Sequence, residues 1–260
     1  MDADRVVAAM AYGEPNTDWA RQVATTLDAS FVLVLDEPDR PSLPEYADRM
    51  LVSRSRLGFG GARRVSMLLA SEFGSDCLVV DGDGQHPPAA LERILERLAA
   101  TDADVVIPQR QNQSLWLDRD GERLDRWPFE RLETLCAFAA ADIDAEPDSE
   151  FDAQPGAFGF RSAVGPSLVP SDDGWLADWE ITVRALERGS YETIEITTTP
   201  SVQEETTFSW ADQRRKLLDI DDRLRETGSN GVRAVFDRHR DEFSPDARET
   251  ITDAVMSINE

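Results

Sequence analysis

The sequence predicts an α/β protein with a mostly parallel sheet flanked by helices and a helical C-terminal extension. Short apolar runs of strand length alternate with helical stretches up to about residue 110, and strands separated by helices form a parallel sheet. One of these runs leads directly into an Asp-Gly-Asp turn. From residue 206 onward, apolar side chains recur at helical spacing. We therefore expect a domain over residues 1–205 and an extension over residues 206–260.

Five apolar runs are expected to form the first strands of the sheet: RVVAAMA (5–11), FVLVL (31–35), MLV (50–52), CLVV (77–80) and ADVVI (103–107). Three segments between them have apolar residues three and four positions apart and are expected to be helical: DWARQVATTLD, GARRVSMLLASEF and PAALERILERLAA. Pro87 and Pro88 suit the start of the helix expected in PAALERILERLAA, where a missing amide hydrogen costs little. Ligands of such sheets bind beyond the carboxyl ends of the strands, where Asp36 and Asp81 fall.

The second half of the chain continues with fewer strands. Residues 114–126 are polar and charged without a clear period, and we expect a mobile loop there that can act as a lid. A helix is expected in FERLETLCAFAAA, a strand in GAFGFR, a helix in WLADWEITVRALERG and a strand in YETIEITTTP. The helices of the C-terminal extension should pack through an apolar stripe of Trp210, Leu217, Leu218, Ile220 and Leu224.

The composition limits the classes of partner. The 260 residues include 51 acidic and 27 basic side chains, which gives a formal net charge of -24. A field of this sign repels nucleic acid and anionic membranes, so we expect no nucleic-acid partner. Lys216 is the only lysine, and this arginine-rich, acidic composition resembles proteins of salt-loving microbes. The acidity is then a solvated surface, and an anionic ligand must be bound by local arginines or by a metal.

The cysteines and the apolar runs favour a cytoplasmic protein. Cys77 and Cys136 are far apart in apolar surroundings, so we expect reduced, buried thiols without a disulfide or a metal pair. The longest apolar run, LCAFAAA, is far shorter than the ~20 residues that span a bilayer. We expect a cytoplasmic protein that can still touch a membrane surface.

The stretch DGDGQH predicts a divalent-cation site. Two carboxylates at ~4 Å repel by about 4 kcal/mol at an effective dielectric constant of ~20, so one of them is protonated or a cation lies between them. Asp81, Asp83 and the amide of Gln85 supply hard oxygens that suit Mg²⁺ or Mn²⁺. Gly82 and Gly84 permit the backbone angles of a tight turn. Aspartate and glycine are also ordinary turn residues, so the tripeptide alone leaves a purely structural interpretation open.

In its context, DGDGQHPP resembles the metal motif of family 2 glycosyltransferases of the GT-A fold. The nearest branch is that of the dolichyl-phosphate mannose synthases, whose motif reads Asp-Ala-Asp-x-Gln-His-Pro-Pro. The resemblance covers roughly residues 5–200 and implies a GT-A fold with a nucleotide-sugar site. His86 is otherwise expected to be a structural residue at the start of a helix, and Trp175 and Trp179 can equally shape a sugar pocket or fill the core.

The resemblance assigns further residues on the donor side. AYGEP matches a strand end that reads Tyr-Asn-Glu in the family, with Gly13 in place of the asparagine, and VLDEPD matches the paired aspartates that hold the base. RSRLGFGGARR matches a segment that covers the nucleotide, and ADVVIPQR a strand that ends in a phosphate-binding arginine. Arginines 54, 56, 63 and 64 can alternatively pair with surface acids. The implied nucleotide-sugar residues are Tyr12, Glu14, Asp36, Arg54, Asp81 and Arg110.

The resemblance also covers the acceptor side. FDAQPGAFGFR is similar to an Asp-x-x-Ser-Gly-Phe stretch and selects Asp152, Gln154 and Gly156 as acceptor residues. WLADWEITVRALERG is similar to the segment with the catalytic Glu-Asp pair, with Ala177 in place of the glutamate. Asp178 is then the expected catalytic base. It lies just inside the start of a helix, where the helix dipole favours a charged carboxylate.

The resemblance implies a metal-dependent and inverting hexosyltransferase. The donor is a nucleoside-diphosphate sugar, and the acceptor is a polyprenyl phosphate or a small hydroxyl compound. A sugar nucleotidylyltransferase is a second candidate, but AYGEPN lacks the glycine-rich loop that such enzymes carry after the first strand. A catalytically idle nucleotide-sugar-binding protein is a third, because Ala177 replaces one catalytic acid.

Overall fold

The computed structural model describes residues 3–12, 17–36, 43–111, 116–144, 147–148, 150–199 and 208–256. By its internal packing the chain divides into two units. Unit 1 comprises Met1–Gln113 and Pro155–Val202, and unit 2 comprises Ser114–Gln154 and Gln203–Glu260. The chain enters unit 2 twice, near residue 114 and near residue 203. The domain boundary expected after residue 205 lies close to the second of these points, whereas no sequence pattern indicated the first.

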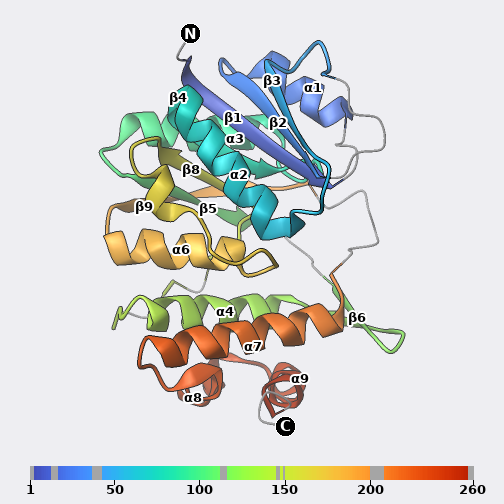
Figure 1. The fold of residues 1–260 in the computed structure, drawn as a ribbon. Coiled ribbons are helices and arrows are strands. Elements are labelled where there is room, and N and C mark those ends of the chain that lie inside the picture. Colours follow the sequence, from blue (N-terminus) through green and yellow to red (C-terminus); the bar gives the residue numbers. More distant parts are fainter. Residues whose placement is uncertain are drawn as a thin grey trace. The chain divides into compact units, whose positions relative to one another are not determined.

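Unit 1 is built on a seven-stranded sheet in the order β3-β2-β1-β4-β8-β5-β9 (Figure 1). β8 is antiparallel to both neighbours, and every other pair of neighbours is parallel. The prediction of an α/β fold with a mostly parallel sheet is confirmed. The strands are β1 (Ala3–Tyr12), β2 (Ser30–Asp36), β3 (Arg49–Ser53), β4 (Gly74–Asp81), β5 (Val105–Gln111), β8 (Ala157–Arg161) and β9 (Tyr191–Thr197).

Helices cover both faces of this sheet because successive side chains of a strand point to opposite faces. On one face, Ala9 of β1 joins a core with Trp19 of α1 and Ile94 of α3. On the other face, Met10 packs with Ala62 of α2. The helices of unit 1 are α1 (Thr17–Thr26), α2 (Gly58–Phe73), α3 (Pro88–Ala100), α5 (Gly165–Leu168) and α6 (Ala177–Arg188).

The register of the strands brings their carboxyl ends to one edge of the sheet. Tyr12 at the end of β1 pairs with Asp36 at the end of β2, and Asp36 pairs in turn with Ser53 of β3. On the other side of β1, Met10 pairs with Asp81 at the end of β4. The polar residues that follow these apolar strands therefore meet at one edge, as the sequence predicted.

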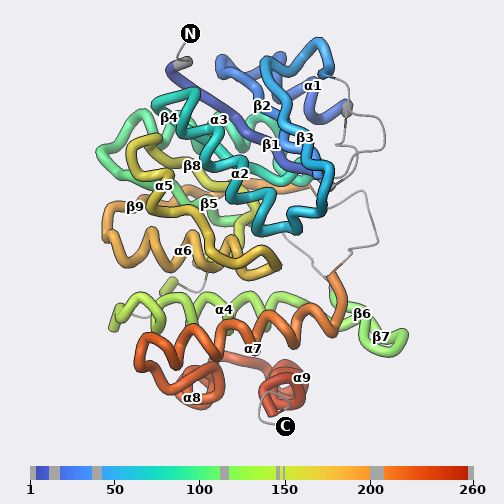
Figure 2. The backbone as a smooth tube through the Cα atoms, viewed as in Figure 1, coloured from blue at the N-terminus to red at the C-terminus, as the bar shows by residue number. Residues whose placement is uncertain are grey.

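Unit 2 is mainly helical (Figure 2). α4 packs against α7, and both contact α8 and α9. A two-stranded sheet of β6 and β7 precedes α4. The elements are β6 (Trp116–Arg119), β7 (Glu122–Asp125), α4 (Trp127–Ala140), α7 (Trp210–Glu226), α8 (Gly231–Arg238), the 3-10 helix Arg240–Glu242 and α9 (Pro245–Met256).

The prediction of a mobile loop over residues 114–126 is wrong for its described part. Arg119 pairs with Glu122 across a two-residue turn, which makes β6 and β7 a hairpin. Asp120 and Gly121 both have positive φ, 52° and 84°, as the tight turns of hairpins require. The Asp-Gly dipeptide was therefore a hairpin signal. It was missed because the flanking strands are only four residues long.

The apolar stripe of α7 is confirmed except at one position. Leu217, Ile220 and Leu224 are fully buried, whereas Leu218 is 36% exposed. Leu218 follows a buried leucine by one position, which turns it about 100° away from the packed face of the helix. Trp210, the remaining member, is half-buried, and the packing of these four side chains supports the structural interpretation of the stripe.

Unit 2 also contains a buried polar network that sequence reasoning did not find. Glu133 of α4 accepts hydrogen bonds from the side-chain amides of Gln154 and Gln213, the latter at 2.7 Å. The Lys216 ammonium lies 3.3 Å from Glu133 and also donates to Gln154. Burial lowers the pKa of Lys216, and the Glu133 carboxylate opposes this shift. The only lysine of the chain is therefore a buried structural partner.

The two cysteines behave as expected, since Cys77 and Cys136 are free thiols and both are buried. Burial raises the pKa of Cys77 to about 12, which keeps this thiol protonated. No helix in the described part of the chain has the length and apolar character needed to cross a membrane.

Candidate functional site

The carboxylate of Asp36 holds the start of α2. Its oxygens accept hydrogen bonds from the backbone amides of Leu57, at 2.9 and 3.0 Å, and Gly58, at 3.1 Å. These amides have no partner within the helix, and an anion at this position also complements the helix dipole. Asp36 therefore links the end of β2 to α2. The role in base binding expected from the sequence stays a prediction.

The other predicted nucleoside residues lie around the same edge. Tyr12 ends β1 beside Asp36, and Arg54 follows β3 with an exposed side chain. Glu14 lies outside the described residues. The backbone thus brings Tyr12, Asp36 and Arg54 to one edge, while their contacts with a nucleotide remain predictions.

The turn after β4 carries the predicted metal ligands Asp81, Asp83 and Gln85. The backbone amide of Gly82 donates to the Met10 carbonyl at 2.7 Å. A Cβ at Gly82 would lie 2.8 Å from that oxygen, so only glycine permits this approach. An Asp83 carboxylate oxygen accepts a hydrogen bond from the backbone amide of Gln85 at 2.9 Å, which closes the turn.

Several charges act on Asp81. Burial raises its pKa to about 8, the positive charges of Arg63 and Arg110 lower it, and the neighbouring carboxylates of Asp178 and Asp83 raise it. Arg110 lies near the end of β5 and is 8% exposed. The structure thus brings the predicted phosphate-binding arginine into the electrostatic environment of the predicted metal ligands.

Arg63 joins the two predicted halves of the site, and sequence reasoning missed it. Its guanidinium donates to both carboxylate oxygens of Asp178, from Nε at 2.8 Å and from Nη2 at 3.1 Å. The same Nη2 donates to Asp81 Oδ1 at 2.9 Å and to the Gly156 carbonyl at 3.3 Å. The side chain of Arg63 is fully buried, so it does not pair with surface acids.

A sequence signal for Arg63 did exist. It lies four positions before Met67 and seven before Ala70, and both of these are buried on α2. Residues at this spacing share one face of a helix. An arginine at an apolar position of an amphipathic helix indicates a buried acidic partner, because a buried charge must be paired.

Asp178 lies in the first turn of α6, as the sequence predicted. It is 4% exposed, and its carboxylate faces Arg63. The location near a helix start is confirmed, whereas the role as catalytic base stays a prediction. Ala177, which stands where the resembled motif has a glutamate, is fully buried at the beginning of the same helix.

The predicted acceptor residues separate into the two units. Gly156 belongs to unit 1, and its carbonyl also accepts from the backbone amide of Asp81 at 3.1 Å. Its φ is +70°, and a Cβ there would lie 3.0 Å from Asp81 Oδ2. Asp152 and Gln154 belong to unit 2, where the Asp152 carboxylate accepts from the Gln154 backbone amide at 2.8 Å. Their contact with an acceptor stays a prediction.

Two of the remaining sequence alternatives have structural answers. His86 is 1% exposed, and its Nε2 lies 2.8 Å from the Pro155 carbonyl, which fits a structural residue. Trp179 is 2% exposed and fills the core. Trp175 is half-buried and stacks on Phe59 of α2, with ring centroids 5.1 Å apart.

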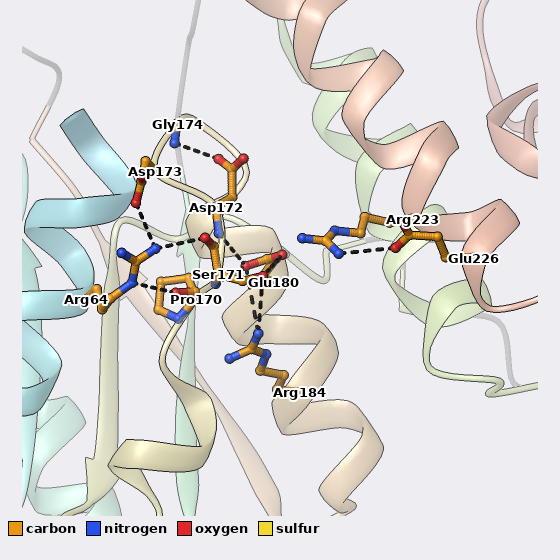
Figure 3. Close-up of polar contacts among 10 residues, drawn as sticks. All are labelled: Arg64, Pro170, Ser171, Asp172, Asp173, Gly174, Glu180, Arg184, Arg223 and Glu226. Carbon is orange, nitrogen blue, oxygen red and sulfur yellow. Dashed lines mark hydrogen bonds and ion pairs between the residues drawn. The ribbon is translucent and has the colours of Figure 1, made fainter. Parts of the chain in front are cut away.

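The segment Pro170–Gly174, which we call the strap, packs on the start of α2 (Figure 3). Arg64 donates to the carbonyls of Pro170 at 2.9 Å and Ser171 at 2.8 Å. From α6, Glu180 accepts from the backbone amides of Ser171 at 2.5 Å and Asp172 at 3.1 Å. The strap thus ties α2 to α6, the two helices that carry Arg63 and Asp178.

We expect the change Gly60→Ala to destabilise unit 1 by about 1–3 kcal/mol, which is typical of overpacking. A Cβ at Gly60 would lie 2.0 Å from the Asp172 carbonyl, so the strap would have to move. Gly61→Ala is a matched control, because its Cβ would meet only side-chain atoms, the nearest at 3.2 Å. Chemical denaturation of both variants measures the difference. Equal stability of the two would show that the strap does not press on α2.

The sequence matches no known protein-family profile and no curated protein. Solved structures do resemble its fold. S. aureus TarS (residues 1–349) aligns with a TM-score of 0.51 and 12% identity, over 85% of this chain and 65% of that chain. The same protein in complex with UDP-GlcNAc gives 0.49 and 15%, over 85% and 66%. A 4-diphosphocytidyl-2C-methyl-D-erythritol synthase from Anaerococcus prevotii gives 0.42 and 10%, over 80% and 94%.

The chain has a GT-A-like fold. At 12% identity the likeness to TarS concerns the fold alone, and the chain spans 65% of the length of that TarS fragment. The GT-A-like fold expected from the sequence is therefore confirmed. A closer relation to the dolichyl-phosphate mannose synthase branch stays a proposal.

The side chains of the turn after β4 offer hard oxygen donors that fit a divalent cation, and metal binding there stays a prediction. No group of three or more His, Cys, Asp or Glu side chains in the described part of the chain is arranged to hold a metal ion. Asp81 and Asp83 supply carboxylates, and the repulsion of Asp83 and Asp178 raises the pKa of Asp81. A cation would relieve this repulsion, and two carboxylates with the Gln85 amide suit Mg²⁺ or Mn²⁺.

Proposed function

We propose that this chain is a family 2 glycosyltransferase. It transfers a hexose from a nucleoside-diphosphate sugar to a polyprenyl phosphate or a hydroxyl acceptor, with Mg²⁺ or Mn²⁺ and with inversion. The observation that carries the proposal is the cluster of Arg63, Asp81 and Asp178 on a GT-A-like fold. It joins the proposed donor-side carboxylate to the proposed base across 97 positions of sequence.

In this proposal the residues at the carboxyl ends of the strands have different roles. Tyr12, Glu14, Asp36 and Arg54 bind the nucleoside, and Arg110 contacts the diphosphate. Asp81, Asp83 and Gln85 hold the cation, which neutralises the charge of the leaving diphosphate when it is bound. The carboxylate of Asp178 takes a proton from a hydroxyl acceptor, or orients an acceptor that is already an anion.

The acceptor side is the second part of the proposal. Asp152, Gln154 and Gly156 are proposed to face the acceptor. A polyprenyl phosphate would bring the chain to a membrane surface, whereas a small hydroxyl compound would not. The net charge of -24 opposes binding to anionic lipid, so contact with such a membrane would need local arginines.

Two other functions remain candidates. A sugar nucleotidylyltransferase would use a similar α/β sheet and metal carboxylates, but AYGEPN lacks its glycine-rich loop. A catalytically idle nucleotide-sugar-binding protein is favoured by Ala177 at the position of a catalytic acid. Slow hydrolysis of a nucleotide sugar without acceptor separates the transferase from the idle protein, since many transferases transfer slowly to water.

A thermal-shift screen of nucleoside diphosphates and their sugars tests the proposal. We expect one nucleoside diphosphate to raise the melting temperature only when Mn²⁺ is present. A ligand at 100 times its Kd stabilises the folded state by about 2.7 kcal/mol if it binds only that state. High salt should be used to screen the acidic surface. The absence of a shift with every nucleotide would reject a nucleotide-sugar site.

A further inference from the structure

Arg63 is shared unequally between two carboxylates. Nε and Nη2 donate to Asp178, whereas Nη2 alone donates to Asp81, at 2.9 Å. Asp178 is 5% exposed at its side chain and Asp81 is 26% exposed. The Asp178 carboxylate is therefore less open to solvent than the Asp81 carboxylate.

The guanidinium does not use all its donors. Nη1 of Arg63 is buried and has no hydrogen-bond partner among the described residues. A buried donor without a partner costs about 1–3 kcal/mol, so a purely structural arginine would be expected to satisfy it. Such an exception calls for an explanation, and a catalytic role or a bound ion is among the usual ones. The burial of Arg63 opposes its charge, while the carboxylates of Asp178 and Asp81 favour it.

We propose that Arg63 is a positioning residue and a built-in counter-cation. Its guanidinium fixes Asp178 and holds the Asp81 carboxylate until a divalent cation competes for Asp81. This inference rests on the proposed function, because it takes Asp81 as a metal ligand and Asp178 as a group on the acceptor side.

The competition follows from the geometry. A cation that binds Asp81 meets the fixed positive charge of Arg63, whose Nη2 lies 2.9 Å from Oδ1 of the same carboxylate. The two carboxylates of Asp81 and Asp178 would repel each other without this charge. The coupling between Arg63 and a cation on Asp81 is reciprocal. The cation therefore weakens the interaction of Arg63 with Asp81, and the guanidinium then interacts with Asp178 alone.

The decisive variant is Arg63→Met, which removes the charge and keeps much of the side-chain volume. We expect Mn²⁺ to bind at least about fivefold more tightly to the ligand-free variant, the lower end of usual coupling effects. Turnover of nucleotide sugar should fall at least tenfold, because Asp178 is no longer fixed. A purely structural role of Arg63 would lower or leave unchanged the Mn²⁺ affinity, and that result would overturn the inference.

Arg64→Met is the matched control. It removes the same charge one position along α2, from a side chain that contacts the strap and not Asp81 or Asp178. We expect its Mn²⁺ affinity to stay within about twofold of the wild type. An equal gain in both variants would show a general charge effect and overturn the inference.

A second comparison applies if Arg63→Met alone does not fold. Removing one partner of a buried pair is strongly destabilising, whereas replacing both partners often is not. Asp178→Asn should weaken Mn²⁺ binding, because the positive charge of Arg63 is then balanced only by the carboxylate of Asp81. Adding Arg63→Met to that variant should restore the affinity and raise it at least about fivefold above Asp178→Asn. No gain would overturn the inference.

The Mn²⁺ measurement, by electron paramagnetic resonance of the free ion, needs no sugar nucleotide. If the wild type binds Mn²⁺ but turns over no nucleotide sugar, the proposed function fails and the Arg63 comparison still decides the inference. If neither the wild type nor Arg63→Met binds Mn²⁺, the inference fails.

Discussion

Replacing Asp178 by asparagine is expected to lower kcat with a hydroxyl acceptor at least ~10²-fold, the usual contribution of a general base. Asparagine keeps an oxygen that can accept a hydrogen bond from Arg63, but its amide cannot take a proton. At saturating Mn²⁺ the donor affinity should stay within about twofold. A loss in kcat without a loss in donor binding indicates an interaction made in the transition state.

Asp173→Asn is the control for this variant. Asp173 is an acid of the strap, and its side chain is 71% exposed and pairs with Arg64. We expect its kcat to stay near that of the wild type. Near-normal turnover of Asp178→Asn with a hydroxyl acceptor would reject the base. If turnover is kept only with a phosphate acceptor, Asp178 orients an acceptor that is already ionised.

The variants Asp81→Asn and Asp83→Asn are expected to abolish the metal dependence of nucleotide binding. Each removes one of the two carboxylates at the end of β4, and a neutral amide oxygen is a weaker ligand for a hard divalent cation. Titration of a nucleoside diphosphate with and without Mn²⁺ measures this dependence. The Asp81 change also removes one partner of Arg63, so its effect on binding should be compared with that of Asp83→Asn.

Asp102→Asn is a suitable control because Asp102 is an exposed acid of unit 1 that follows α3. Its loss changes the net charge by the same amount away from the turn after β4. We expect it to keep the full metal dependence. If both turn variants bind the diphosphate with unchanged metal dependence, the metal site lies elsewhere.

The sequence by itself determined the elements of unit 1 and the location of most candidate residues. Apolar runs such as CLVV that are separated by helical segments predict the strands of a parallel sheet. Such strands are buried on both faces and are therefore nearly continuous apolar runs. The carboxyl ends of such strands meet at one edge, which placed Tyr12, Asp36 and Asp81 together. The helix expected from Trp175 was also found, although α6 begins two residues later, at Ala177.

Only the tertiary structure decided which segments pack together and which charges face each other. Asp120 and Gly121 form a hairpin turn whose strands were too short to predict, and residues 114–154 pack with the C-terminal helices. Arg63 could pair with any acid as far as its sequence neighbours show. Its burial against Asp81 and Asp178 depends on β4, α2 and α6 packing together, since an ion pair between residues 115 positions apart leaves no local pattern.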